Sequence, residues 1–238
     1  MQTLIHSFTF FGSHHGLMQD KTLAHLAISF ASIGVALVIA VPLGVWLGHL
    51  HRGSFLAINV SNIFRALPSL AMISIGIGVL GIGFANVLVA LVVLAAPVML
   101  TNAYVAVEHV DRNAVEAARA AGMRPWQVLT RVELPLAAPL IFAGIRTGTV
   151  YVVATATLAT FAGGGGLGDV IVNEPTYGVP GVIAGSLAIT VLAFGIDGLL
   201  ALVQHAATPK PMRRQNRFSR TAATVTEAAR DNLVIQQS

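Results

Sequence analysis

The sequence predicts an all-α, polytopic membrane protein with about five transmembrane helices. Only 10% of its 238 residues are charged, 55% are hydrophobic, and the mean hydropathy is +0.76. About a quarter of an average globular chain is Asp, Glu, Lys or Arg, and a water-soluble monomer this poor in charge would expose large apolar patches. The apolar residues are spread over nearly the whole chain, which excludes a single membrane anchor of about 20 residues.

Five apolar segments are each long enough to cross a bilayer at ~1.5 Å per residue. The first lies within residues 22–51, a stretch that has no Asp, Glu, Lys or Arg. The uncharged run 66–107 is too long for one crossing, and its glycine-rich part, 76–83, divides it. The five expected spans are 23–50, 55–80, 85–107, 136–161 and 179–203.

The basic residues indicate the orientation, because cytoplasmic loops carry an excess of Lys and Arg. Three segments fall on one side of the five spans, and the opposite side has Lys21 as its only basic residue. We therefore expect the N-terminus outside and the C-terminus in the cytoplasm of a cell-membrane protein. The basic residues of the three segments are Arg52 in the first loop, Arg112, Arg119, Arg124 and Arg131 in the second, and Lys210, Arg213, Arg214, Arg217, Arg220 and Arg230 in the tail.

These spans divide the chain into three parts. Residues 1–21 form an extracytoplasmic N-terminal segment without the basic start of a secretory signal peptide. Residues 22–206 form the transmembrane domain. The tail, 207–238, is basic and has no sustained apolar stripe, so we expect it to be disordered. It serves either as a solvated anchor on the positive side or as an attachment to anionic headgroups.

The cytoplasmic loop 108–135 is far longer than a simple connection and has its own helical pattern. Asn113 is expected to cap a helix whose third residue, Glu116, completes a capping box, and Gly122 is placed to end it in the left-handed conformation. Pro125 suits the first turn of a second helix, which Pro135 is expected to end. The small stripe of the first helix is Ala114, Ala117, Ala118 and Ala121, and the apolar side of the second is Trp126, Leu129 and Val132.

The amino-acid sequence of this loop indicates a protein family more specifically than its helical pattern does. Glu116-Ala117-Ala118, three residues, Gly122, nine residues, Val132, one residue and Leu134-Pro135 resemble the EAA motif of permease subunits of ABC importers, with valine in place of the usual isoleucine. A wider resemblance over 61–188 is to the osmoprotectant (glycine betaine, carnitine, choline, proline betaine) subgroup. It rests on the strings IFRALPSLA, GIG, VEAARAAGMRPWQVLTRVELPLAAPLIFAGIR and TATLATFAGGGGLGD.

The resemblance implies a type I (MetI-like) importer permease that works as a dimer with itself or with a sister permease. The implied partners are two cytoplasmic ATPase subunits and one extracytoplasmic binding protein. In that family the loop is a coupling helix seated in a cleft of the ATPase. The coupling residues would be Glu116, Ala117, Ala118, Gly122, Leu134 and Pro135.

The sequence also allows alternatives to this function. The loop could be a plain surface structure in which Glu116 only caps its helix. An importer of another small solute, such as methionine, is the alternative within the class. A secondary transporter would need internal repeats and broken midplane helices, and the sequence shows no repeat.

Two glycine-rich runs match G-x-G-x-x-G, at 163–168 and from Gly76 to Gly81. Neither lies between a strand and a helix, as a nucleotide fingerprint requires, and Asp169 stands where a P-loop has lysine. We therefore expect a turn or a tight re-entry of the chain at 163–168. We expect no ATP hydrolysis by this chain, hence no enzyme activity, and no cofactor or nucleic-acid partner. With no cysteine and only scattered histidines, we expect neither a metal site nor a catalytic group.

Two arginines lie about ten residues inside expected spans, where a charge is costly unless it is paired or hydrated. Arg65 is expected to share a helical face with Asn62 and Ser69, and Arg146 with Thr149, Thr157 and Thr160. Asp197 could pair with either arginine. These stripes either line the translocation path or hold the bundle together. The aromatic residues are too dispersed for a cation cage, so a separate binding protein is expected to select the solute. The candidate path residues are Asn62, Arg65, Ser69, Arg146, Thr149 and Asp197.

Overall fold

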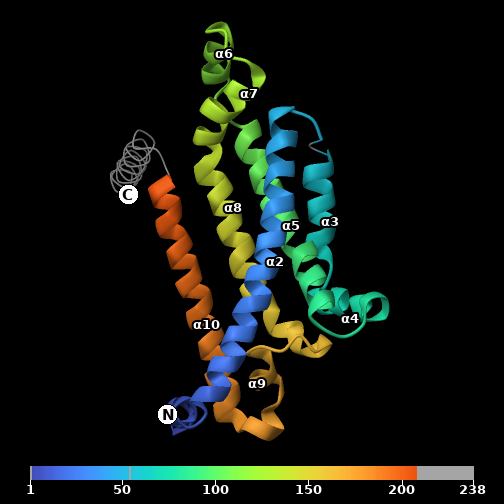
Figure 1. Cartoon of the computed structure of the whole chain (residues 1–238), viewed down its shortest axis with the longest axis vertical. Coiled ribbons are helices and arrows are strands. Elements are labelled where there is room, and N and C mark those ends of the chain that lie inside the picture. Colours follow the sequence, from blue (N-terminus) through green and yellow to red (C-terminus); the bar gives the residue numbers. More distant parts are fainter. Residues whose placement is uncertain (1, 54, 208–238) are drawn as a thin grey trace, which may run out of the picture.

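The computed structural model describes residues 2–53 and 55–207, and this part of the chain is helical without strands (Figure 1). The expected tail, 207–238, lies outside the described residues except for Ala207. The elements are α1 Gln2–Ser13, α2 His15–His49, η1 Leu56–Val60, α3 Ser61–Ala66, α4 Ser69–Leu80, α5 Phe84–Glu108, α6 Arg112–Ala120, α7 Pro125–Val128, η2 Leu129–Glu133, α8 Leu134–Thr155, η3 Ala156–Ala162, α9 Gly168–Val172 and α10 Glu174–Ala207.

Helices α2, α5 and α8 form the core of the bundle, and small residues let them approach closely. A Cβ on Gly44 of α2 would lie 2.5 Å from the carbonyl oxygen of Leu100, and one on Gly48 would lie 2.7 Å from that of Tyr104. On α8, a Cβ at Gly144 would lie 2.3 Å from the Cβ of Asn102. Glycines four residues apart are the usual means by which membrane helices bring their backbones together.

The expected second span, 55–80, is not one straight helix. Its two parts are bent by 86° at the break before Ser69. Pro68 precedes α4 with an extended backbone, as proline does when it begins a helix instead of continuing one. In the described residues, four helices are therefore long and apolar enough to cross a membrane, or five if the bent pair counts as one span. Gly81 and Gly83, both with positive φ, separate α4 from α5 as the sequence predicts.

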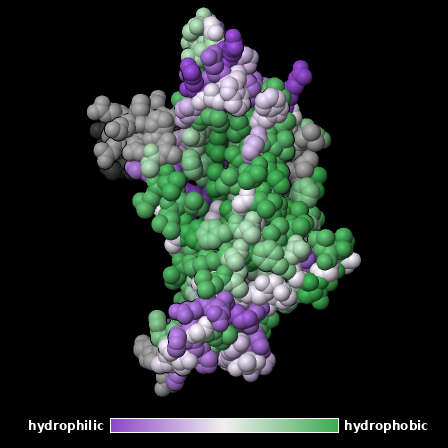
Figure 2. Space-filling model, viewed as in Figure 1, coloured by the Kyte–Doolittle hydropathy of each residue, from purple (hydrophilic) through white to green (hydrophobic). Residues whose placement is uncertain are grey.

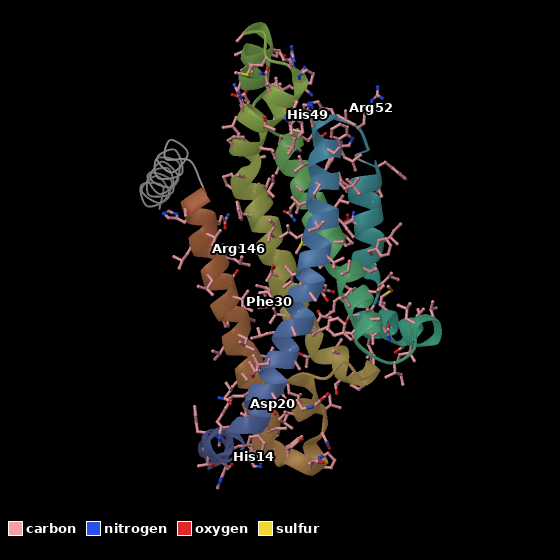
Figure 3. All side chains as sticks on the ribbon, in the orientation of Figure 1. His14, Asp20, Phe30, His49, Arg52 and Arg146 are labelled. Carbon is pink, nitrogen blue, oxygen red and sulfur yellow. The ribbon has the colours of Figure 1, made fainter. Side chains whose placement is uncertain are left out.

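The two ends of the bundle are polar and the band between them is apolar (Figure 2). The α6–α7 loop lies at one end together with His49 and Arg52, whereas His14 and Asp20 lie at the other end (Figures 1 and 3). At this second end, Lys21 donates to Asp169 across 2.6 Å, and Thr160 also donates to Asp169. The glycine-rich run 163–168 is therefore a tight turn that is fastened to the beginning of α2.

Helix α10 packs less tightly than the other long helices. Only 6% of its most apolar window is buried, against 33% to 44% in the other three long helices. It rests against α8 along one side, and near its beginning it contacts α1 and α9. The large apolar side chains that it leaves exposed are Val179, Val191, Phe194, Leu199, Leu202 and Val203. Within residues 2–53 and 55–207, no other element covers one face of this helix.

Candidate functional site

The first helix of the α6–α7 loop, α6, begins two residues earlier than the sequence predicts. Asp111, not Asn113, is the capping residue, and its side chain accepts a hydrogen bond of 3.0 Å from the backbone N–H of Asn113. The expected capping box is therefore wrong. An aspartate accepting from a first-turn N–H is an ordinary cap. Glu116 is therefore not part of the N-terminal cap of α6.

The loop buries a different stripe from the one expected. Val115 and Ala118 are buried in an apolar cluster that the loop shares with α5 and α8, whereas Ala117 and Ala121 are exposed. Valine covers more apolar surface than alanine, so the helix turns Val115 inward and Ala117 outward. Glu116 and Ala117 consequently stand side by side on the free surface of α6.

Gly122 ends α6 as predicted, with φ of +81°. A Cβ built on Gly122 would meet nothing within 4 Å, so its backbone conformation, and not crowding, favours glycine here. Pro125 then begins α7, where Arg124 precedes it in an extended conformation. Trp126 was expected on the apolar side of α7, yet 66% of it is exposed. Val128 and Leu129 occupy the buried positions in its place.

Pro135 does not end the second loop helix, contrary to the sequence prediction. The chain is helical without interruption from Pro125 to Ala162, a run of 38 residues. Five residues in the π conformation, η2, lie just before Pro135. Such a bulge lets the helix continue past a proline, which has no N–H to donate to the preceding turn. The loop helix and the fourth span are thus one rod, with Leu134 and Pro135 half-buried inside it.

Sequence reasoning missed a polar contact at the base of the loop. Nδ1 of His49, at the end of α2, donates to Oε2 of Glu133 in η2 across 2.5 Å. Their side chains are only 11% and 2% exposed. A buried carboxylate is stable only with partners of this kind. The contact joins residues 84 positions apart, so no local spacing signals it.

A second polar cluster lies between α8 and α10 inside the apolar band (Figure 3). Arg146 binds Asp197 through two parallel hydrogen bonds, Nε to Oδ1 at 3.0 Å and Nη2 to Oδ2 at 2.8 Å. Arg146 also donates from Nη1 to Gln204 at 2.9 Å, and Gln204 donates to the carbonyl of Pro139 at 2.8 Å. The side chains of the ion pair remain 29% and 34% exposed.

These residues border a groove of about 700 Å³ between the two helices. Small ligands bind in cavities of ~300–1,000 Å³ that are mostly apolar with a few polar groups. The groove is lined by Ala143, Arg146, Thr147, Val150, Ala154, Ile189, Thr190, Ala193, Phe194, Asp197 and Gln204.

The other candidate path residues do not join this cluster. Thr149 is buried in the bundle and does not line the groove. Asn62 and Ser69 lie on α3 and α4, on the opposite side of the bundle from α10 (Figure 1). The bend before Ser69 also removes the common helical face expected for these two residues. The side chain of Arg65 lies outside the described part of the structure. Among the candidate path residues whose side chains the structure describes, Arg146 and Asp197 are the pair that it brings together.

Comparison with known proteins shows which family the chain belongs to. Residues 40–208 match the family model of the binding-protein-dependent transport system inner membrane component. The chain belongs to this family. It is the permease component of an ABC importer. Permeases of this family lie in the inner membrane and work with a substrate-binding protein and an ATPase.

Among relatives of this permease is the choline transport system permease OpuBB of Bacillus subtilis, 39% identical over 90% of this chain and 99% of the relative. The glycine betaine/carnitine/choline permease OpuCB of the same organism is 39% identical over 89% and 98%. The carnitine transport permease OpuCB of Listeria monocytogenes is 35% identical over 86% and 94%.

Solved structures agree on the fold of the permease. An inward-facing structure of the MetNI methionine ABC transporter superposes with a TM-score of 0.72 and 25% identity, over 83% of this chain and 99% of that one. An amino acid ABC transporter crystallised with histidines gives 0.64 at 16% identity, over 82% and 96%. The expected type I importer fold is confirmed.

Proposed function

We propose that this permease forms the translocation path for a small osmoprotectant such as glycine betaine, carnitine, choline or proline betaine. The observation that carries the proposal is the likeness, over nearly the whole of both chains, to permeases named for choline, glycine betaine and carnitine. The methionine transporter shares the fold at lower identity, so methionine is the weaker candidate solute.

In this proposal the α6–α7 loop transmits the movement of the ATPase. Glu116 and Ala117 are exposed side by side on α6, next to a reversal that Gly122 allows. Ala118 anchors the helix from its buried side, and Leu134 and Pro135 continue it into α8. A protruding, rigid knob with a small-residue face suits insertion into a cleft of another protein. ATP hydrolysis takes place on that partner and not on this chain.

The proposed assembly follows from the two polar ends. The end with the α6–α7 loop also carries Arg52 (Figure 3), and we place it in the cytoplasm, with the N-terminus outside. Two permeases, identical or sisters, would pair there with two ATPase subunits, and one binding protein would dock at the outer end. The uncovered face of α10 supports pairing, because a permease needs a second surface to enclose a path.

The function is tested by uptake in cells that lack their own osmoprotectant importers. The permease is produced with its ATPase and binding protein, and entry of radiolabelled glycine betaine, carnitine, choline and methionine is measured. We expect uptake of at least one of the three trimethylammonium solutes, and none in cells producing an ATPase without its catalytic glutamate. Uptake of methionine alone would refute the osmoprotectant proposal and retain the importer.

A further inference from the structure

The side chains of the ion pair in the groove between α8 and α10 are only partly covered. About a third of each side chain remains accessible, although both residues lie well inside long apolar helices. A pair whose only role is to hold two helices together is most stable when neighbouring side chains cover it, since lipid cannot solvate charge. Here the groove of about 700 Å³ keeps one side of the pair open instead.

The charges of this pair restrict what the groove can hold. A guanidinium has five N–H donors, and Arg146 uses three of them in the bonds to Asp197 and Gln204. A ligand with a single charge would satisfy one member of the pair and leave the other uncompensated, which is costly away from water. A zwitterion can satisfy both, with its carboxylate on the guanidinium and its cationic group on Asp197.

An aromatic ring stands beside the negative member of the pair. Phe194 lines the same groove and lies three residues before Asp197 on α10, which places the two side chains on one face of the helix. The residue is 75% exposed, which leaves its side chain accessible to a ligand in the groove. Quaternary ammonium groups bind to the faces of aromatic rings. One ring and one carboxylate make a partial cation site, which the dispersed aromatic residues of the sequence did not suggest.

We propose that the groove between α8 and α10 binds a zwitterion that carries a carboxylate and a quaternary ammonium group. Arg146 binds the carboxylate, and Asp197 and Phe194 bind the cation. Gln204 holds Arg146 in place by linking it to the backbone of α8 at Pro139. The inference rests on the proposed function and assigns the solute class of the permease itself, separately from selection by the binding protein.

Phe194 provides a test that leaves the ion pair intact. Because it lies on the face of α10 that we propose to pair with a second permease, the amount of assembled complex is measured together with uptake. We expect F194L to raise the KM for glycine betaine uptake by about three- to thirty-fold, the value of a cation–aromatic contact, and F194Y to retain uptake. F30L is the matched control, since Phe30 is also exposed, at 53%, and does not line the groove. It should behave as wild type.

Three results would overturn the inference. F194L could match wild type, F194L and F30L could lower uptake equally, or F194Y could be as defective as F194L. In each case wild-type uptake of glycine betaine would leave the proposed function standing. A wild-type complex that takes up choline but no zwitterionic osmoprotectant would refute the zwitterion site and leave the proposed function standing. A complex that takes up none of the trimethylammonium solutes would refute both proposals.

The charges are tested by comparing glycine betaine with choline, which has the same ammonium group but no carboxylate. We expect R146Q to lower uptake of glycine betaine at least tenfold more than uptake of choline, and D197N to lower both. The double variant R146Q/D197N removes both charges and keeps the assembly free of a lone charge, and it should lose glycine betaine uptake as R146Q does. Complex recovered by gel filtration gives the amount assembled.

A purely structural pair predicts a different pattern. Both solutes would then be lost in proportion to the amount of assembled complex, and R146Q/D197N would recover uptake of both. That result would refute the site. Where wild type imports glycine betaine but not choline, the Phe194 comparison decides.

Discussion

At the scale of single residues, the contact between His49 and Glu133 fastens the base of the α6–α7 loop to the end of α2. It is buried, short and formed between two separate helices. Removing one partner of such a contact leaves the other desolvated without compensation, which destabilises far more than the loss of an exposed pair.

We therefore predict that Glu133→Ala destabilises the permease by roughly 2–4 kcal/mol and lowers its melting temperature in detergent by several degrees. Glu116→Ala is the matched control, since Glu116 is exposed on the same loop and its loss should leave the melting temperature unchanged. Equal melting temperatures for both variants would show that the buried contact contributes nothing.

We expect a substitution at Gly122 to affect the proposed coupling to the ATPase and not the stability of the permease. Asp is among the residues that tolerate a positive φ, and no atom lies within 4 Å of the position of its Cβ. Gly122→Asp should fold and insert normally but place a side chain and a charge against the ATPase. The loss of one central contact of this kind is about 2 kcal/mol or more, hence roughly a thirty-fold fall in uptake.

The measurement for Gly122→Asp pairs solute uptake with ATP hydrolysis in the same reconstituted complex. Hydrolysis should continue, or lose its dependence on solute, while uptake falls. Membrane yield serves as the control for insertion. Unchanged uptake would remove Gly122 from the coupling surface.

At the scale of elements, the close packing of α2 on α5 depends on the absence of side chains at two positions. A Cβ at Gly44 would meet the backbone oxygen of Leu100, and a backbone atom cannot move aside as a flexible side chain can. Ala36 and Ala40 continue the same stripe and are almost completely buried.

We predict that Gly44→Val destabilises the bundle by about 1–3 kcal/mol or more, as overpacking does, and reduces the yield of monodisperse protein in gel filtration. Gly34→Val makes the same change in the same helix where no atom lies within 4 Å. A similar loss of yield in both variants would mean that helix propensity, and not packing, accounts for the effect.

The sequence predicted helices best where the signal was local and continuous. The long apolar runs predicted where the long helices lie, except that the second expected span is bent before Ser69, and the glycines at 81 and 122 marked the ends of α4 and α6. Proline was ambiguous, because the same residue begins a helix after an extended neighbour, as at Pro68, and sits inside one after a π bulge, as at Pro135. The site was predictable to the extent that an intramembrane Arg146 and Asp197 require partners. The groove beside them depends on how loosely α10 packs, which no spacing encodes.

At the scale of the whole molecule, the absence of cysteine from the chain makes its orientation measurable. Asp20 and Arg124 are exposed residues at opposite ends of the bundle. We predict that a membrane-impermeant maleimide labels Asp20→Cys in intact cells and labels Arg124→Cys only after the membrane is opened. The reverse pattern would invert the proposed topology and place the α6–α7 loop out of reach of a cytoplasmic ATPase.

The unbroken helical run from Pro125 to Ala162 connects the α6–α7 loop directly to the groove. At ~1.5 Å per residue the run is about 55 Å long, and Arg146 lies roughly 24 Å from its far end. If the run turned as one body about Ala162, Arg146 would move by about two-fifths of any shift imposed at Pro125. With α10 held in place, a shift of about 5 Å at the loop would then separate Arg146 from Asp197 by roughly 2 Å, enough to break both hydrogen bonds. Because Pro135 lies inside this helical run and does not end it, such a movement would reach the ion pair through one continuous segment.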